Sequence, residues 1–188
     1  MYFVSAYLIG NIMFGYLVMK YLHGKDIRMI GSGNVGARNA GRFGGKSAFV
    51  IIFLGDALKG VTVILLGRYL GYSEAMQLLG LGFAVIGHIK PITLKFKGGK
   101  GISTFIGGIL AFQPLLTLVI ISAFLVFYPL TKSFTLAGLG TLFMIPVVLL
   151  IGSDKVINCF IIFTIIILIL LAHSQNIKER LTNHEQKS

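Results

Sequence analysis

The distribution of apolar residues constrains this chain more than any other feature. Of its 188 residues, 55% are hydrophobic and only 12% are charged, whereas a soluble domain carries roughly a quarter charged residues. The apolar residues form blocks that approach the ~20 residues needed to cross a bilayer as a helix. The blocks predict an all-α polytopic membrane protein with about seven transmembrane helices, near residues 2–22, 46–70, 74–87, 102–112, 115–130, 134–151 and 155–173.

Two of these blocks are shorter than a usual span. Residues 74–87 and 102–112 are therefore expected to form partial or tilted helices that bring the loop between them into the membrane. No long polar linker divides the chain. We expect one integral membrane domain over residues 1–188.

The positive charges predict an orientation. The net charge is +11, and most Lys and Arg residues lie in three segments, at 20–46, 90–100 and 178–187. The positive-inside rule assigns such segments to the cytoplasm, so the N-terminus lies outside and the C-terminus inside. The alternative is that the charges only set topology and contact anionic lipid. That alternative does not explain why they are mixed with Gly, Ser, Asn and His.

The segment 87–101 is too polar to face lipid and too rich in glycine to be a regular helix. Irregular backbone at a membrane is tolerated only in water or along a protein cavity. The three glycines around Lys100 permit positive φ and leave backbone N–H groups uncovered, and consecutive N–H groups of this kind bind anions. Lysine charges suit phosphate, and a histidine can donate, accept or titrate. The segment predicts a phosphate-binding loop with candidate residues His88, Lys97, Gly98, Gly99, Lys100 and Gly101.

A second polar segment, residues 31–39, reads Gly-Ser-Gly-Asn-Val-Gly-Ala-Arg-Asn. Its alternating glycines expose backbone N–H groups, and its Ser and Asn side chains can bind a polyol or a phosphate. Arg42 follows and can hold a phosphate at two points. A merely flexible connection is the alternative. The candidate substrate-binding residues here are Ser32, Gly33, Asn34, Asn39 and Arg42.

Residues 40–47 fit a loose Walker pattern in which Ala replaces the first Gly. A nucleotide-binding P-loop follows a buried strand and opens a helix inside a sheet. No strand is predicted before residue 40, and a membrane span follows. We therefore do not expect nucleotide binding.

The last predicted span leads into a third polar segment. His173, Asn176, Ile177 and Arg180 recur at helical spacing and share one face. An ordinary helix end with basic residues is the alternative. We expect no metal site, because no Cys, Asp or Glu accompanies His88 or His173 at ligand spacing.

The second span contains Asp56 and Lys59. At a separation of three residues they can pair on one helix face. Charges within a span are costly and suggest function, but a structural ion pair facing the bundle interior is an equal alternative. Asn11, in the first span, is expected to bond another helix.

These segments resemble the acyl-phosphate:glycerol-3-phosphate acyltransferase family of bacterial inner membranes. Residues 31–39 and 87–101 match its first two motifs, and residues 56–60 match its Asp-x-x-Lys-Gly. The third motif, His-x-x-Asn-Ile with a later Glu, is matched from His173 to Glu185. The chain departs from the family where it carries Arg38, Lys90, Ser174, Glu179, Asn183 and His184.

The resemblance implies transfer of a fatty acyl group from acyl phosphate to the 1-hydroxyl of glycerol 3-phosphate, giving lysophosphatidic acid and phosphate. It implies a catalytic set of Lys100, His173 and Asn176, with Thr135 added to the substrate site. Lys100 and the neighbouring glycine amides are expected to stabilise charge on the acyl phosphate and its leaving group. His173 is either a base or a binder. An activated acyl donor needs no cofactor and no covalent enzyme intermediate.

Two other functions stay open. One is an organophosphate transporter, although transporters usually show related halves with a midplane site. The other is a non-catalytic protein that binds anionic lipid. The expected partners are the two substrates and membrane lipid, without nucleic acid, and the oligomeric state is open, with a monomer possible. The expected location is the bacterial inner membrane, with the active site facing the cytoplasm.

Overall fold

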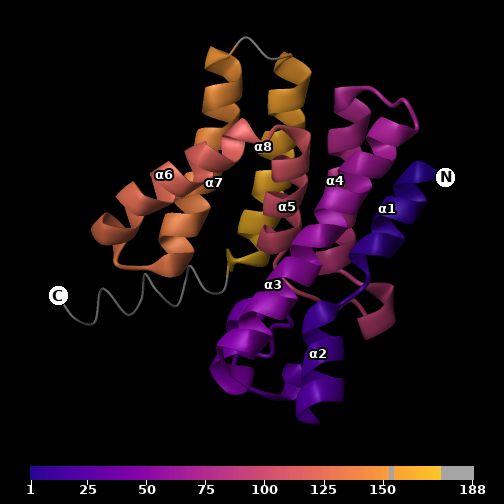
Figure 1. Ribbon diagram of the computed structural model, residues 1–188, viewed down its shortest axis with the longest axis vertical. Coiled ribbons are helices and arrows are strands. Elements are labelled where there is room, and N and C mark those ends of the chain that lie inside the picture. Colours follow the sequence, from indigo (N-terminus) through magenta and orange to yellow (C-terminus); the bar gives the residue numbers. More distant parts are fainter. Residues whose placement is uncertain (153–154, 175–188) are drawn as a thin grey trace. The chain divides into compact units, whose positions relative to one another are not determined.

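A computed structural model describes residues 1–152 and 155–174, and every regular element in these ranges is helical (Figure 1). The helices, in chain order, are α1 (Tyr2–Gly10), α2 (Phe14–His23), η1 (Ile27–Met29), α3 (Ala37–Tyr69), α4 (Glu74–Ile89), η2 (Ile92–Leu94), α5 (Ile102–Phe112), α6 (Leu115–Thr131), α7 (Phe134–Ile151) and α8 (Val156–Ala172).

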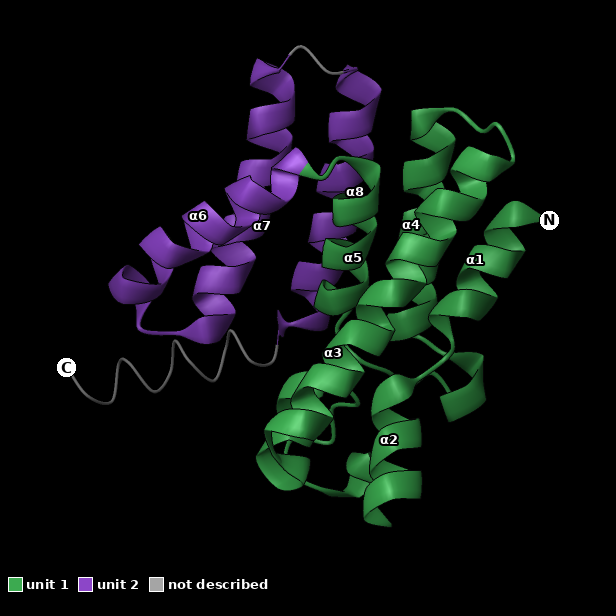
Figure 2. Ribbon diagram, in the orientation of Figure 1, with its two compact units in different colours: residues 1–114 green, residues 115–188 purple. Residues whose placement is uncertain are grey.

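The chain forms two compact units, Met1–Pro114 and Leu115–Ser188 (Figure 2). In the first unit, α3 packs against α2, α4 and α5, and α1 packs against α4. In the second unit, α7 packs against both α6 and α8. The assignment of residues 1–188 to one domain stays a prediction.

The seven predicted apolar blocks all correspond to helical segments. Four are long and apolar enough to cross a membrane, namely Tyr2–His23, Ala37–Tyr69, Glu74–Leu94 and Phe134–Ile151. Shorter apolar helices occupy Ile102–Phe112, Leu115–Thr131 and Val156–Ala172. The short α5 agrees with the partial helix expected from its sequence.

Two helices differ from the sequence prediction. The first span is not continuous but is broken between Gly10 and Phe14, where the side chain of Asn11 accepts a hydrogen bond from the backbone of a distant loop. The second span begins early, at Ala37, and contains the non-helical Gly45 with φ 78° and ψ −175°. Glycine adopts such a φ without steric cost, so the helix resumes beyond a kink where the sequence suggested only a loop.

Small residues bring α3 and α5 into backbone contact. A Cβ on Gly60 would meet the Thr104 carbonyl and the Gly108 backbone, and a Cβ on Gly107 would meet the Ala57 carbonyl. Close approach through small residues is the usual way in which membrane helices associate. This contact fixes α5, and with it the loop that precedes α5.

Replacing Gly60 by alanine should weaken the α3–α5 contact, because the new methyl group meets backbone atoms that cannot rotate away. We expect a loss of about 1–3 kcal/mol, seen as a lower thermal midpoint of the purified protein in detergent. Gly138→Ala is the matched control, since its Cβ position meets no neighbouring side chain or other helix within 4 Å. Equal losses in the two variants would contradict this account of the packing.

Candidate functional site

The ammonium of Lys59 lies where the first span is broken. Its Nζ lies 2.9 Å from Asp56 Oδ1 and donates to the backbone carbonyls of Ile12 at 2.9 Å and Gly10 at 3.2 Å. It also lies 2.8 Å from His88 Nδ1. Carbonyls at a helix break have no partner within the helix, and Lys59 satisfies two of them.

The loop after α4 folds back onto His88. The backbone N–H of Gly99 donates to the His88 carbonyl at 3.0 Å. A Cβ on Gly98 would meet that same carbonyl, and a Cβ on Gly99 would meet the His88 ring at Nε2. Gly101 begins α5 with φ 85°. Gly98 and Gly99 are therefore needed because the loop approaches His88 closely. Only Gly101 has the positive φ that we expected of all three glycines.

The outer part of the same loop is attached to the middle of the first span. Ile92 donates its backbone N–H to Asn11 Oδ1 at 2.6 Å, and the Thr93 hydroxyl donates to the Asn11 carbonyl at 3.2 Å. The Tyr7 hydroxyl donates to the Lys90 carbonyl at 2.9 Å. Asn11 therefore bonds the loop rather than a neighbouring helix, and the loop lies beside the middle of a span.

The lysines of this loop differ in exposure. Lys97 is exposed, whereas Lys100 is partly buried between buried Gly99 and Gly101. Lys100 immediately precedes the first turn of α5. The first N–H groups of a helix have no partner within it and attract anions. Lys100 and the start of α5 together suit a phosphate.

Asn39 organises the first polar loop. Its side chain donates to the carbonyls of Ile30 at 3.0 Å and Asn34 at 3.1 Å, and accepts from the backbone N–H of Ser32 at 3.2 Å. It is 2% exposed. Gly33, with φ 67°, turns the chain beside the exposed Ser32 and the partly exposed Asn34. Asn39 shapes the loop, and Ser32 and Asn34 are the residues it presents.

The basic side chains near this loop fall into two groups. Arg28 pairs with Asp26 at 2.7 Å, and the hydrogen bond from the Arg28 side chain lowers the pKa of the Asp26 carboxyl to about 2. Arg42 instead lines a hollow of about 530 Å³ together with Arg38, Gly41, Lys46, Phe49 and Val50. Cationic groups beside apolar ones suit an anionic amphiphile. Because this stretch lies within α3, residues 40–47 do not form a P-loop.

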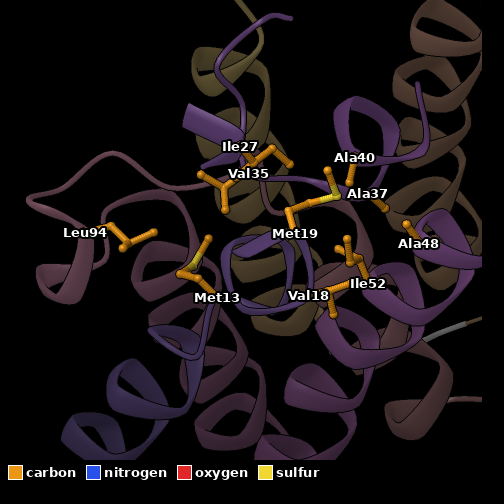
Figure 3. Close-up of a cluster of buried hydrophobic side chains, with 10 residues drawn as sticks. All are labelled: Met13, Val18, Met19, Ile27, Val35, Ala37, Ala40, Ala48, Ile52 and Leu94. Atoms are coloured by element: carbon orange, nitrogen blue, oxygen red, sulfur yellow. The ribbon is translucent and has the colours of Figure 1, made fainter. Parts of the chain in front are cut away.

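The two polar loops of the first unit share one hydrophobic core. Leu94, from the second loop, belongs to the same buried cluster as Ile27 and Val35, from the first (Figure 3). Met13, at the break in the first span, belongs to it as well. The structure therefore brings the two loops to one region of the first unit.

Two further candidate residues lie in the second unit. Thr135 is buried in the first turn of α7. His173 follows α8, is 5% exposed, and has Nδ1 2.8 Å from the Ile169 carbonyl. Because α7 and α8 follow one another and pack together, the start of α7 and the end of α8 lie at the same end of the pair. Asn176 lies outside the described residues.

Sequence reasoning missed several participants in this arrangement. It identified Asp56 and Lys59 as a pair but not their contacts with Ile12 and His88, and it missed Phe49 and Val50 in the hollow. The isolated Asn11 in an apolar block was the available signal for the break. Nothing local to Lys59 indicated which carbonyls it would reach.

Comparisons with known proteins agree with this geometry. The family described as "Glycerol-3-phosphate acyltransferase" matches residues 1–183. "Glycerol-3-phosphate acyltransferase 1" of Bacillus cereus (strain ATCC 10987 / NRS 248) is 46% identical over 170 residues, covering 90% of this chain and 93% of the relative. The protein of the same name from Desulfitobacterium hafniense (strain Y51) is 38% identical over 184 residues, covering 98% and 91%.

Two crystal structures of PlsY (YgiH), an integral membrane glycerol 3-phosphate acyltransferase, are also similar. The glycerol 3-phosphate form has a TM-score of 0.88 and 32% identity, and covers 97% of this chain and 91% of that chain. The lysophosphatidic acid form has a TM-score of 0.87 and 31% identity, with coverage of 97% and 91%. The motifs, the fold and these matches agree: the chain belongs to the glycerol-3-phosphate acyltransferase family of integral membrane enzymes.

Proposed function

We propose that this acyltransferase moves a fatty acyl group from acyl phosphate to the 1-hydroxyl of glycerol 3-phosphate, the first step of phospholipid synthesis. The hydroxyl oxygen bonds to the acyl carbon, and the bond from that carbon to the phosphate oxygen breaks. Phosphate leaves with the bonding electrons, and the hydroxyl proton passes to phosphate or to a protein base. The products are lysophosphatidic acid and inorganic phosphate.

The observation that carries the proposal is the glycine loop at the start of α5. Gly99 is hydrogen-bonded back to His88, so the loop has a defined shape beside Lys100. Lys100 lies next to the start of α5 in the sequence, and an ammonium near the first N–H groups of a helix suits the charge that develops on a departing phosphate. Lys97, Gly98 and Gly101 belong to the same loop and complete this part of the site.

The first polar loop supports a second role, that of holding a substrate. Ser32 and Asn34 are presented to solvent by buried Asn39. Arg42 lines the hollow that also contains Phe49 and Val50, an environment in which a phosphate and the start of an acyl chain are both favoured. Holding two anionic substrates in register supplies much of the rate of such a reaction.

In the second unit, we propose His173 and Thr135 as further functional residues. Because a carbonyl only accepts, His173 Nδ1 donates to Ile169, and a neutral ring then carries its lone pair on Nε2. That arrangement suits a base for the glycerol hydroxyl. Thr135 and Asn176 are proposed as hydroxyl and amide ligands of the same substrate.

Neither alternative function is favoured by a specific observation. The family supports an enzyme rather than a transporter. The buried Lys59 pairs with Asp56 and donates to carbonyls at the break in the first span. A protein that only binds anionic lipid would not need the close packing of Gly98 and Gly99 against His88.

The test of the proposed function is an acyl transfer assay with purified protein in detergent, using acyl phosphate and labelled glycerol 3-phosphate, with acyl-CoA in parallel. Labelled lysophosphatidic acid is expected from acyl phosphate alone. Transfer from neither donor would overturn the enzyme assignment, and transfer only from acyl-CoA would overturn the donor.

We further propose a bacterial inner-membrane location with the site in the cytoplasm. In a background without the buried Cys159, the single cysteines of Lys25→Cys and Lys95→Cys should react with an impermeant maleimide only from the cytoplasmic side. Ser73→Cys should react only from outside, because it lies at the opposite end of α3 and α4. Labelling of residue 95 from outside would reverse the orientation.

Lys100→Ala should lower turnover by roughly a hundredfold to a thousandfold, the usual cost of losing a donor to transition-state charge. Lys95→Ala is the control, because Lys95 is exposed and should mainly weaken substrate attraction. Lys100→Arg should recover little activity, since the larger planar fork does not fit between two buried glycines.

The assay above, run on folded variants, measures these effects. If Lys100→Ala turns over within a few-fold of the parent while Lys95→Ala is inactive, the catalytic lysine has been assigned wrongly.

A further inference from the structure

The buried charge pair in α3 contacts two parts of the chain that the proposed reaction does not otherwise explain. Lys59 is 3% exposed and Asp56 is 1% exposed. Neither side chain reaches the hollow that contains Arg42. Burying such a pair costs free energy that apolar residues would avoid. We therefore ask which parts of the chain the pair holds in place.

The contacts of the Lys59 ammonium have a fixed direction. An ammonium only donates, so the carbonyls of Gly10 and Ile12 and the Nδ1 of His88 all accept from it. A neutral His88 ring then carries its proton on Nε2. Lys59 thereby fixes the end of α1, the break that follows it, and the orientation of one ring.

The His88 ring transmits this constraint to the glycine loop. Its Nε2 edge lies directly against Gly99, where no side chain fits, and its backbone carbonyl accepts from the Gly99 N–H at 3.0 Å. Asp56 Oδ1 lies 2.9 Å from the ammonium and 3.6 Å from His88 Nδ1, so the carboxylate lies beside both groups. The path from Lys59 to Gly99 thus passes through a single buried ring.

The break in the first span is tied to the same loop on its other side. Asn11, next to the carbonyls that Lys59 holds, accepts from Ile92 and Thr93. The loop is therefore fixed at its beginning by Asn11 and at its glycines by His88. Both attachments depend on where the ammonium of Lys59 lies.

We propose that Lys59, held by Asp56, is a positioning residue that sets the conformation of the Gly98–Gly101 segment through the His88 ring. The inference rests on the proposed function for its catalytic consequence, and on the geometry alone for the conformation of the loop. In this proposal the His88 ring supports the loop by packing against Gly99. Lys59 acts through His88 and does not contact a substrate.

The test is amide hydrogen exchange over residues 95–101, together with activity, in Lys59→Met. Methionine keeps the length of the side chain but removes the charge and the donors. Loss of hydrogen bonds from a charged group should speed exchange in this segment about tenfold or more and lower turnover by a similar factor. Lys59→Arg, which keeps charge and donors, should recover part of the protection.

Arg68→Met is the matched control from the same helix. Arg68 donates to the carbonyls of Ala111 and Phe112 at 3.0 and 3.3 Å, at the far end of α5 from the loop. It should leave exchange over residues 95–101 as in the parent. A folded Lys59→Met with parental exchange in that segment would overturn the proposal, whatever its activity. Hydrogen exchange needs no substrate. A failure of the proposed reaction would therefore be seen separately, as absence of acyl transfer by the parent protein.

A second pair of variants tests the same connection if Lys59→Met does not fold. Gly99→Ala places a methyl group against the His88 ring, and Gly98→Ala places one against the His88 backbone carbonyl. In a His88→Ala background, the loss of thermal midpoint caused by Gly99→Ala should shrink, while that caused by Gly98→Ala should persist. Equal persistence of both losses would overturn the role of the ring.

Discussion

A single ammonium group, that of Lys59, connects the break in the first span with the histidine that the glycine loop packs against. The first span is broken at Asn11, and a broken helix in a membrane exposes carbonyls that lipid cannot satisfy. Lys59 reaches those of Gly10 and Ile12 from α3 and is itself paired with Asp56. Removing one member of a buried ion pair typically costs about 3–5 kcal/mol, because the other charge is left uncompensated. The carbonyls at the break thus need the donors of Lys59, and the buried ammonium needs these carbonyls and Asp56 as partners.

The proposed phosphate site depends on this arrangement. The loop before α5 folds over His88, whose ring is oriented by Lys59, and it is attached to the first span through Asn11. The α3–α5 contact through Gly60 and Gly107 fixes where α5 begins. The other polar loop joins through a shared core containing Leu94 and Val35. The irregular, glycine-rich backbone therefore packs on other parts of the first unit, as is required of non-helical backbone in a membrane.

Much of this could be predicted from the sequence, for identifiable reasons. Apolar blocks follow a local rule, so a helical segment lies at each of the seven predicted blocks. The anion site that the glycine and lysine pattern of residues 98–101 indicates stays a prediction. The partners of Lys59 and Asn11 could not be predicted, because Lys59 and Gly10 are 49 positions apart and Asn11 and Ile92 are 81 positions apart. The roles of Asn39 and His88 were also uncertain, since a polar side chain near a motif can serve the loop or the ligand. The structure shows that the buried Asn39 serves the loop, because its side chain bonds to three backbone groups.

In the proposed arrangement, Lys59 donates to His88 and thereby fixes the ring against the glycine loop. Nitrogen NMR of the purified protein with ¹⁵N-labelled histidine, with the His88 signals assigned by comparison with a His88→Asn variant, tests it most directly. We expect a neutral His88 ring with Nδ1 unprotonated and the proton on Nε2, and a change in those signals in Lys59→Met. A His88 ring protonated at Nδ1, or signals unaffected by the loss of Lys59, would contradict it.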